Sequence, residues 1–143
     1  MSIFRDDILS GRVALITGGG SGINFGIAEA LVAHGAKVAL VSRNLERLEA
    51  AAERLSPGQT AARPFAADVR DTVSLKRAVT GCLEAFGRLD ILVNGAAGNF
   101  FAPASKLSPS GFEAVLGIDT LGTFNATRLC YEALERARGT VLN

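Results

Sequence analysis

The sequence predicts an α/β fold, with a doubly wound parallel sheet covered by helices on both faces. Short, continuously apolar segments, of which "VALI" at residues 13–16 is the first, alternate along the chain with longer segments of helical periodicity. Strands that lack alternating polar residues are typical of parallel sheets buried on both sides. A glycine cluster joins the first strand to the first helix, as in a Rossmann fold, in which right-handed crossovers place helices on both faces of the sheet.

Composition indicates one globular domain over residues 1–143. The chain has 48% hydrophobic and 20% charged residues and a formal net charge of +1. This charge provides no electrostatic attraction to nucleic acid or to an anionic membrane, and no apolar run approaches the roughly 20 residues that span a bilayer. Cys82 and Cys130 match no metal-binding spacing, so we expect buried, reduced thiols and no metal site. We therefore expect a cytoplasmic protein with no nucleic-acid or membrane partner.

The first four predicted elements form two strand–helix pairs. Residues 12–17 are a buried strand, and residues 23–34 follow as a helix with apolar side chains three and four positions apart. Gly35 stands where a helix commonly stops. Residues 37–42 predict the second strand, and residues 44–55 predict a second amphipathic helix whose first residue, an asparagine, is a favourable N-cap.

The third strand–helix pair leads into a fourth strand. Residues 60–67 predict a strand, and Pro64 places it near an edge of the sheet because proline cannot donate a hydrogen bond to a neighbouring strand. Asp71 caps a helix that continues to Phe86. Residues 90–94, "DILVN", predict the fourth strand.

The last predicted elements are a loop, a long helix and the start of a strand. After the loop at 95–107, Ser108 and Pro109 form a cap and first-turn pair for a helix that continues to about residue 138. The sequence then stops just after a fifth strand begins, at 139–143. Because a finished domain seldom ends on a strand, we expect the N-terminal portion of a longer single-domain protein, with a native truncation as the alternative.

The glycine cluster "TGGGSGIN" predicts a dinucleotide-binding loop. It fits neither G-x-x-x-x-G-K-[ST], because no lysine follows, nor G-x-G-x-x-G, because Ile23 stands at the last glycine position. The remaining Gly18-x-x-x-Gly22 spacing is weak evidence alone, but between a strand and a helix it brings backbone N–H groups to a pyrophosphate. Asn24 lies at the helix start, where its amide can bond a free backbone N–H group or a phosphate oxygen. The predicted loop contacts are Thr17, Gly18, Gly20, Ser21, Gly22, Ile23 and Asn24.

The end of the second strand favours NADP(H). Sites that prefer NAD place an acid there for the ribose 2′-hydroxyl, whereas this chain has Ser42 and Arg43. A hydroxyl and a guanidinium suit a 2′-phosphate; the alternative is that Arg43 is a solvated surface arginine. Asp68, after the third strand, either reaches the adenine or only caps a turn.

These motifs carry a family resemblance. "TGGGSGI" at 17–23, "DV" at Asp68–Val69 and "ILVNGAAG" at 91–98 resemble, in order and spacing, the N-terminal half of the short-chain dehydrogenase/reductases, from about residue 11 to residue 143. The segments "AAGNF" at 96–100 and "IDTLGTFN" at 118–125 further resemble peroxisomal-type 2,4-dienoyl-CoA reductases and their bacterial relatives. The resemblance implies that the NADP(H) site also includes Val69, Asn94, Gly95 and Ala96.

The resemblance also implies an activity. It implies hydride transfer from NADPH to a conjugated dienoyl-CoA in the breakdown of unsaturated fatty acids, with the cofactor supplying the hydride and the protein handling a proton. A 3-oxoacyl thioester or another carbonyl compound is the alternative substrate. The family's serine and Tyr-x-x-x-Lys elements follow the fifth strand, and Tyr131 does not fit because Glu135 stands where the lysine belongs. A non-catalytic nucleotide-binding fragment is therefore the second alternative.

An apolar stripe along the long helix contains one acid, Asp119. Such a position is costly unless the carboxylate is paired or hydrogen-bonded, so Asp119 is either a catalytic group or a structural carboxylate that bonds the backbone. The resemblance implies aspartate here, acting with a lysine that these residues do not identify. The stripe either packs against a second copy, through the helix near 112–134, or lies in the core of a monomer. It comprises Phe112, Val115, Leu116, Asp119, Gly122, Thr123, Ala126, Leu129, Cys130 and Ala133.

The loop after the fourth strand contains candidate substrate contacts. Phe100 and Phe101 are adjacent aromatic residues at the carboxyl end of a strand, where they are expected to line an acyl pocket; the alternative is that one packs in the core and the other covers the loop. Asn99 is expected to orient a thioester or a cofactor amide. The implied substrate is a small-molecule acyl-CoA.

Overall fold

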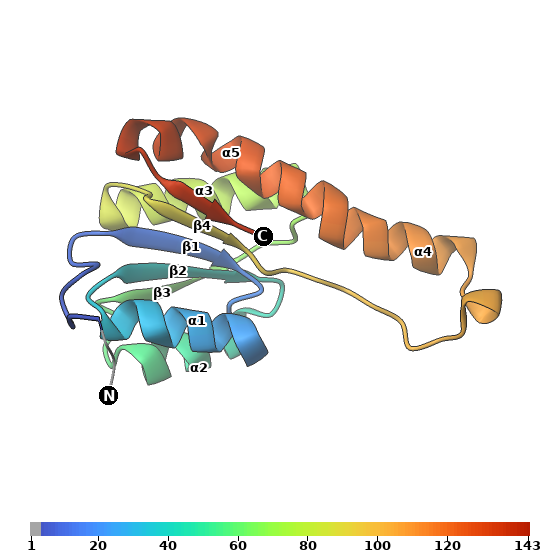
Figure 1. Cartoon of the computed structure of the whole chain (residues 1–143), viewed down its shortest axis with the longest axis horizontal. Coiled ribbons are helices and arrows are strands. Elements are labelled where there is room, and N and C mark those ends of the chain that lie inside the picture. Colours follow the sequence, from blue (N-terminus) through green and yellow to red (C-terminus); the bar gives the residue numbers. More distant parts are fainter. Residues whose placement is uncertain (1–3) are drawn as a thin grey trace.

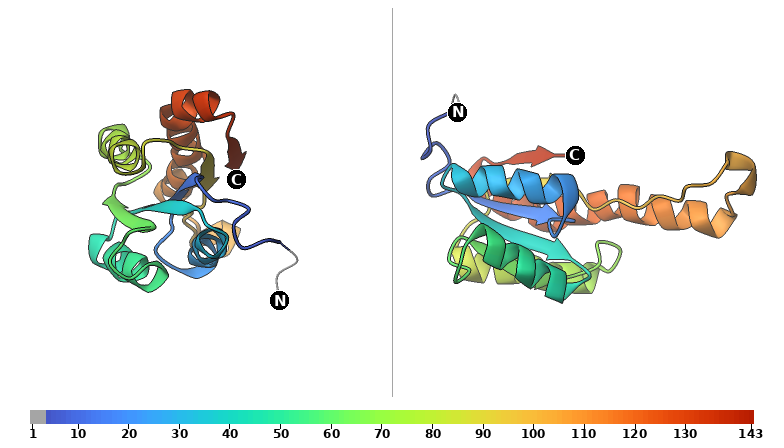
Figure 2. Two further views of the ribbon diagram at one scale, coloured as in Figure 1. Left: turned by 90° about the vertical axis from the view of Figure 1, so that its left-hand side faces the viewer. Right: turned by 90° about the horizontal axis from the view of Figure 1, so that it is seen from below.

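A computed structural model describes residues 4–143, and it contains the predicted parallel sheet, with strand order β3-β2-β1-β4-β5. The helices cover both faces, as Figures 1 and 2 show: α1 and α2 lie on one side of the sheet, and α3 and α5 lie on the other. The doubly wound fold class is therefore confirmed. The strands are β1 (Val13–Thr17), β2 (Lys37–Ser42), β3 (Ala62–Ala66), β4 (Ile91–Asn94) and β5 (Thr140–Leu142).

Helices α2, α3 and α4 begin at the predicted caps Asn44, Asp71 and Ser108. The side chain of Asn44 accepts a hydrogen bond from the Arg47 N–H at 2.9 Å, and Asp71 accepts one from Val73 N–H at 2.9 Å. Each bond satisfies one of the backbone donors that a helix start leaves without an intrahelical acceptor. The helices are α1 (Gly22–Ala33), α2 (Leu45–Leu55), α3 (Thr72–Phe86), α4 (Pro109–Leu116) and α5 (Gly122–Ala137), with a 3₁₀ turn at Ala104–Lys106.

Strand β1 lies at the centre of two hydrophobic cores. Its side chains alternate between them: Val13 and Leu15 face α3 and α5, whereas Ala14 and Ile16 face α1 and α2. All four are at most 2% exposed. The prediction from proline is also confirmed, because β3, which contains Pro64, is an edge strand.

The long helix differs from the prediction. Instead of one regular helix to about residue 138, the structure has α4, a π-helical segment at Gly117–Leu121, and then α5. Within the segment the N–H of Gly122 bonds the carbonyl of Gly117, five residues back. A π turn inserts one residue without changing which residues are apolar, so hydrophobic periodicity does not reveal it. Helix α4 and the loop before it project beyond the sheet (Figure 1).

The predicted apolar stripe divides at the π-helical segment. Ala126, Cys130 and Ala133 are buried against the sheet, whereas Phe112 and Leu116 on α4 are 53% and 44% exposed. The stripe is therefore not wholly buried by the described residues, and the choice between a monomer and an oligomer stays a prediction. The predicted burial of Cys82 and Cys130 is confirmed, and both thiols are free; burial raises the pKa of each thiol to about 12.

A buried carboxylate joins the amino ends of β1 and β4. Asp90, which is 3% exposed, accepts hydrogen bonds from Arg12 Nη1 at 2.8 Å, from Val13 N–H at 3.0 Å and from Arg88 Nε at 2.8 Å. Burial by itself raises the pKa of Asp90, but the hydrogen bonds from Arg88 and Arg12 outweigh it and hold the pKa below its usual value. The charged form therefore stabilises the fold.

We expect Asp90→Asn to lower the free energy of unfolding by about 2 kcal/mol at pH 7, because the two guanidinium groups lose their shared anion. Since the pKa is depressed in the folded state, this stabilisation is present above the unfolded pKa of about 3.9 and is lost as pH falls through the folded value. Urea unfolding at pH 7 and at lower pH measures the difference, with the exposed Glu49→Gln as control. A difference that does not shrink on acidification would contradict this assignment.

Candidate functional site

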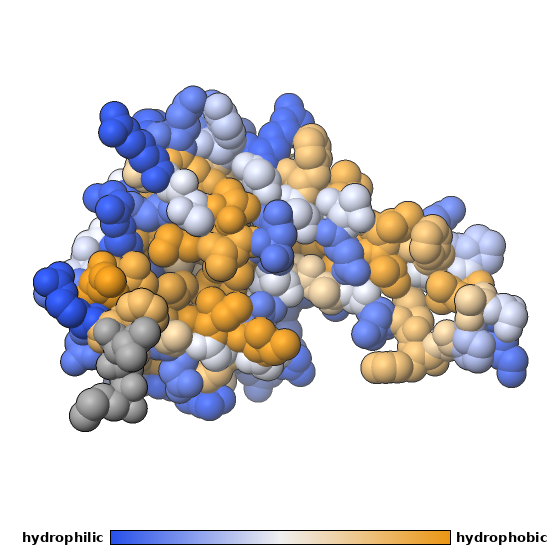
Figure 3. Space-filling view, in the orientation of Figure 1, coloured by the Kyte–Doolittle hydropathy of each residue, from blue (hydrophilic) through white to orange (hydrophobic). Residues whose placement is uncertain are grey.

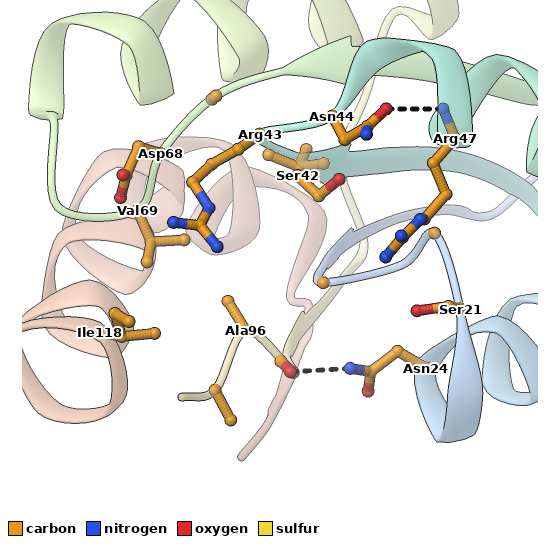
Figure 4. Close-up of a pocket in the computed structure, with 16 residues that line it drawn as sticks. Ser21, Asn24, Ser42, Arg43, Asn44, Arg47, Asp68, Val69, Ala96 and Ile118 are labelled. Carbon is orange, nitrogen blue, oxygen red and sulfur yellow. Dashed lines mark hydrogen bonds between the residues drawn. The ribbon is translucent and has the colours of Figure 1, made fainter. Parts of the chain in front are cut away.

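A cavity of about 900 Å³ opens at the carboxyl ends of the strands. The chain passes from β1 through β2 to β3 on one side of β1, and then returns to place β4 on the other side. Loops that follow neighbouring strands on the two sides diverge at such a reversal, and this leaves a crevice. Loops after β1, β2, β3 and β4 form the walls, and the π-helical segment contributes Ile118 (Figure 4).

The structure brings ten predicted site residues into this cavity, although they come from four separate loops. Their meeting is a consequence of the parallel sheet, because every strand delivers its following loop to the same edge. They are Gly18, Gly20, Ser21, Asn24, Ser42, Arg43, Asp68, Val69, Gly95 and Ala96.

Four predicted contacts do not line the cavity. Thr17 lies beneath it, 1% exposed, and its hydroxyl accepts hydrogen bonds from the N–H groups of Gly95 at 3.0 Å and Ala96 at 3.1 Å. Gly22 opens α1, and Ile23 is 85% exposed. The role of Thr17 is thus to hold the loop after β4, while direct contacts from these positions stay predictions.

Asn94 is the fourth of these residues. Its Nδ2 donates to Thr127 Oγ1 at 3.1 Å and to Asn143 Oδ1 at 2.8 Å. Its Oδ1 is buried without a hydrogen-bond partner among the described residues. A buried acceptor without a donor is costly, so this oxygen is a candidate to receive a ligand's hydrogen bond.

The glycine loop lies close to β2 and to the segment after β4 because Gly18 and Gly19 have no side chains. Gly18 has a φ of +71°, a conformation that favours glycine. A Cβ atom there would lie 2.8 Å from the carbonyl oxygen of Gly95, and one at Gly19 would lie 2.9 Å from Leu40 Cδ2. The loop backbone can therefore pass between β2 and the segment after β4, which leaves its surface open to a ligand.

Asn24 forms a different hydrogen bond from those the sequence suggested. Its amide Nδ2 donates to the carbonyl oxygen of Gly95 at 2.7 Å rather than bonding a free N–H group at the helix start (Figure 4). The bond joins the loop after β1 to the loop after β4. Sequence reasoning missed it because residues 24 and 95 meet only when β1 and β4 pair.

Two arginines extend into the cavity, Arg43 from the β2–α2 connection and Arg47 from the start of α2 (Figure 4). Arg43 was predicted, and Arg47, in the first turn of α2, was not. Neither guanidinium forms an ion pair with any residue in 4–143. The other lining residues that the sequence did not single out are Val41, Asn44, Ala67, Ala97 and Ile118.

Asp68 forms the predicted turn cap and also lines the cavity, while its contact with the adenine stays a prediction. Its carboxylate lines the cavity and also closes a turn, accepting from Arg70 N–H at 2.9 Å and from Arg70 Nη2 at 2.6 Å. The hydrogen bond from the Arg70 side chain holds the pKa of Asp68 below its usual value, and the charge of Arg43 contributes in the same direction. Because Asp68 is paired with Arg70, the charge of Arg43 remains available to an anion.

Asp119 lies in the π-helical segment, next to the cavity residue Ile118. Its Oδ1 accepts a hydrogen bond from Gly98 N–H at 2.8 Å, which ties the helix to the loop after β4. This is the backbone contact that a structural carboxylate makes. Its neighbour Ile118 lines the cavity and Asp119 does not, so proton transfer by Asp119 stays a prediction.

The predicted substrate contacts lie away from the cavity. Asn99 is exposed, and Phe100 and Phe101 are 56% and fully exposed, respectively, on the segment that leads to α4. The alternative in which one of these phenylalanines packs in the core is not seen in the described chain. Both are available for contact with another surface.

Sequence comparison identifies the family. Residues 12–143 match the model described as short chain dehydrogenase, so the chain belongs to this family of oxidoreductases. It is 49% identical over 132 residues to the peroxisomal 2,4-dienoyl-CoA reductase of Danio rerio, an alignment that covers 91% of this chain and 44% of the relative. The chain thus spans about half the length of such relatives.

Solved structures agree with the family assignment. A 3-ketoacyl-(acyl-carrier-protein) reductase from Brucella melitensis, complexed with NADH, superposes with a TM-score of 0.83 at 34% identity, covering 90% of this chain and 52% of its own. An alcohol dehydrogenase from Thermococcus sibiricus, complexed with 5-hydroxy-NADP, gives 0.85 at 30% identity, covering 91% and 56%. No helix in residues 4–143 has the length and apolar character needed to cross a membrane.

Proposed function

We propose that the cavity binds NADP(H) and that the chain is the nucleotide-binding part of a 2,4-dienoyl-CoA reductase. The observation that carries the cofactor proposal is the end of β2, where Ser42 and the unpaired Arg43 face the cavity and no acid stands ready for a ribose 2′-hydroxyl. A guanidinium without a protein anion favours a phosphate in that position.

The residues present fit a dinucleotide. The side-chain-free surface of Gly18 and Gly20 and the start of α1 suit a pyrophosphate, while Asp68 and Val69 form the wall beyond Arg43. When bound, the cofactor supplies the hydride. The chain's own groups hold and orient it and exclude water from one side of the cavity.

The substrate proposal rests on the relatives. The Danio rerio protein is named for 2,4-dienoyl-CoA reduction, and the Brucella melitensis structure is a ketoacyl reductase; a 3-oxoacyl thioester or another carbonyl compound is therefore the second candidate. The exposed Phe100 and Phe101, with Asn99, are proposed to meet the acyl-CoA. Asp119 is proposed to take part in proton handling with a lysine outside these residues.

Assembly and location are also proposed from these observations. The projecting arm, residues 99–124, exposes apolar side chains over α4 and the loop before it (Figure 3); they include Phe100, Phe101, Phe112, Leu116, Leu121 and Phe124. A homo-oligomer that packs these residues against a second copy would remove them from water. A cytoplasmic location stays a prediction, and the Danio rerio relative is named as a peroxisomal enzyme.

We expect the chain to bind NADPH more tightly than NADH, and Arg43→Asp to level or reverse this preference. The substitution replaces a cation beside the 2′-phosphate with an anion, and we expect a loss of at least about tenfold in NADPH affinity. Fluorescence titration with both nucleotides measures it. Arg77→Asp, an equal charge change on α3 outside the cavity, is the control; equal affinities for the two nucleotides in the parent would contradict the cofactor proposal.

The activity requires a protein that contains these residues together with the remainder of the family's length. We expect it to oxidise NADPH in the presence of a 2,4-dienoyl-CoA, and to do so faster than with a 3-oxoacyl-CoA at the same concentration. Loss of NADPH absorbance measures both rates. Turnover of the 3-oxoacyl-CoA alone would favour the 3-oxoacyl thioester as substrate and would contradict the proposed 2,4-dienoyl-CoA substrate.

In that longer protein we expect Asp119→Ala to reduce kcat by about 100-fold, the usual contribution of a positioned proton donor or acceptor. NADPH affinity should change little, because Asp119 does not line the cavity. Asp119→Asn is the informative partner variant, since it retains an acceptor for Gly98 N–H but cannot exchange a proton at neutral pH. An unchanged rate in both variants would make Asp119 purely structural.

A further inference from the structure

We propose that Asn24 is a positioning residue that fixes the separation of two cavity walls, and that its bulk is matched to the absence of a side chain at Gly95. The inference rests on the proposed dinucleotide function. Asn24 holds the place at which the sequence lacks the last glycine of its loop, and the structure shows how this substitution is accommodated.

Three residues share one small space between the walls. The Asn24 amide donates to the Gly95 carbonyl oxygen at 2.7 Å. A Cβ atom on Gly95 would overlap the Asn24 amide, and a Cβ atom on Gly18 would lie 3.0 Å from Asn24 Nδ2. Position 95 thus has no room for any other residue while Asn24 stays in place, although Gly95 itself does not have a positive φ that demands glycine. The constraint on Gly95 is steric and comes from Asn24.

The Asn24–Gly95 hydrogen bond joins residues that line the cavity. Gly18, Asn24, Gly95 and Ala96 all line the cavity. Thr17 holds the N–H groups of Gly95 and Ala96 from below, so Asn24 supplies the remaining restraint on the Gly95 carbonyl. With both restraints, the loop after β4 is ordered before a dinucleotide arrives, and binding does not have to order it.

A double-mutant cycle tests the steric match. The variants are Asn24→Gly, Gly95→Ala and the two combined, each followed by thermal unfolding of the 143-residue chain. We expect Gly95→Ala to lower Tm clearly when Asn24 is present. In the Asn24→Gly background it should have little effect, because removal of the amide leaves room for the added methyl group. Equal losses of Tm in the two backgrounds would overturn the match.

Nucleotide affinity tests the positioning role. Asn24→Leu keeps the branched side chain of four heavy atoms without the donor, and Asn24→Gly removes both the side chain and the donor. We expect each variant to bind NADPH and NADH about fivefold more weakly than the parent. The loss should be equal for the two nucleotides, because the Asn24 hydrogen bond orders the loop after β4 and does not contact the 2′-phosphate. Unchanged affinity with a lowered Tm would leave Asn24 a purely structural residue, and tighter binding by Asn24→Gly would make it an obstruction; either result overturns the proposal.

The measurements distinguish failure of the proposed dinucleotide function from failure of the positioning role of Asn24. If the parent chain binds neither nucleotide, the proposed function fails, and positioning for a dinucleotide fails with it, whereas the steric coupling of Asn24 and Gly95 is still measured by Tm. If the parent binds NADPH and the Asn24 variants bind it as tightly, only the positioning role is lost. Glu29→Gln, which alters an exposed residue of α1 outside the cavity, is the control for both titrations.

Discussion

The pairing of β1 with both β2 and β4 is the constraint on which the rest of the structure depends. In this position β1 is enclosed by strands on both edges and by helices on both faces, so its side chains from Val13 to Ile16 are apolar and nearly inaccessible. Such a strand has no surface at which to perform chemistry. The groups that line the cavity therefore come mainly from the segments at the carboxyl ends of the strands, where the strand order reverses.

The cavity combines close backbone approach with uncompensated positive charge. Small residues at the ends of β1 and β4 bring the loops together, and Thr17 and Asn24 then fix them with hydrogen bonds. The two charged residues Asp68 and Arg43 differ in whether they form an ion pair. Asp68 is neutralised by Arg70, whereas Arg43 has no such partner in the described chain. An anion that enters therefore meets donors already in place, which reduces the cost of ordering them.

Local signals predicted much of the fold. Asn44, Asp71 and Ser108 cap helices because each needs only its own next few residues to do so, and Pro64 marks an edge strand because its missing N–H group is a local property. Local signals did not predict the π-helical segment at Gly117–Leu121. The helix passes close to Val69 there: a Cβ atom on Gly122 would lie 2.5 Å from Val69 Cγ2. That contact joins residues far apart in the sequence.

The sequence by itself determined the order of strands and helices, the position of the glycine loop, the family and the residue types at the end of β2, because these follow from periodicity and from motifs a few residues long. Only the tertiary structure decided which groups share the cavity and what each one bonds. Asn24 meets Gly95, Asp119 meets Gly98, and Arg47 joins Arg43. The physical reason is that strand pairing and helix packing set these distances, and a residue's sequence position does not encode its neighbours across the sheet.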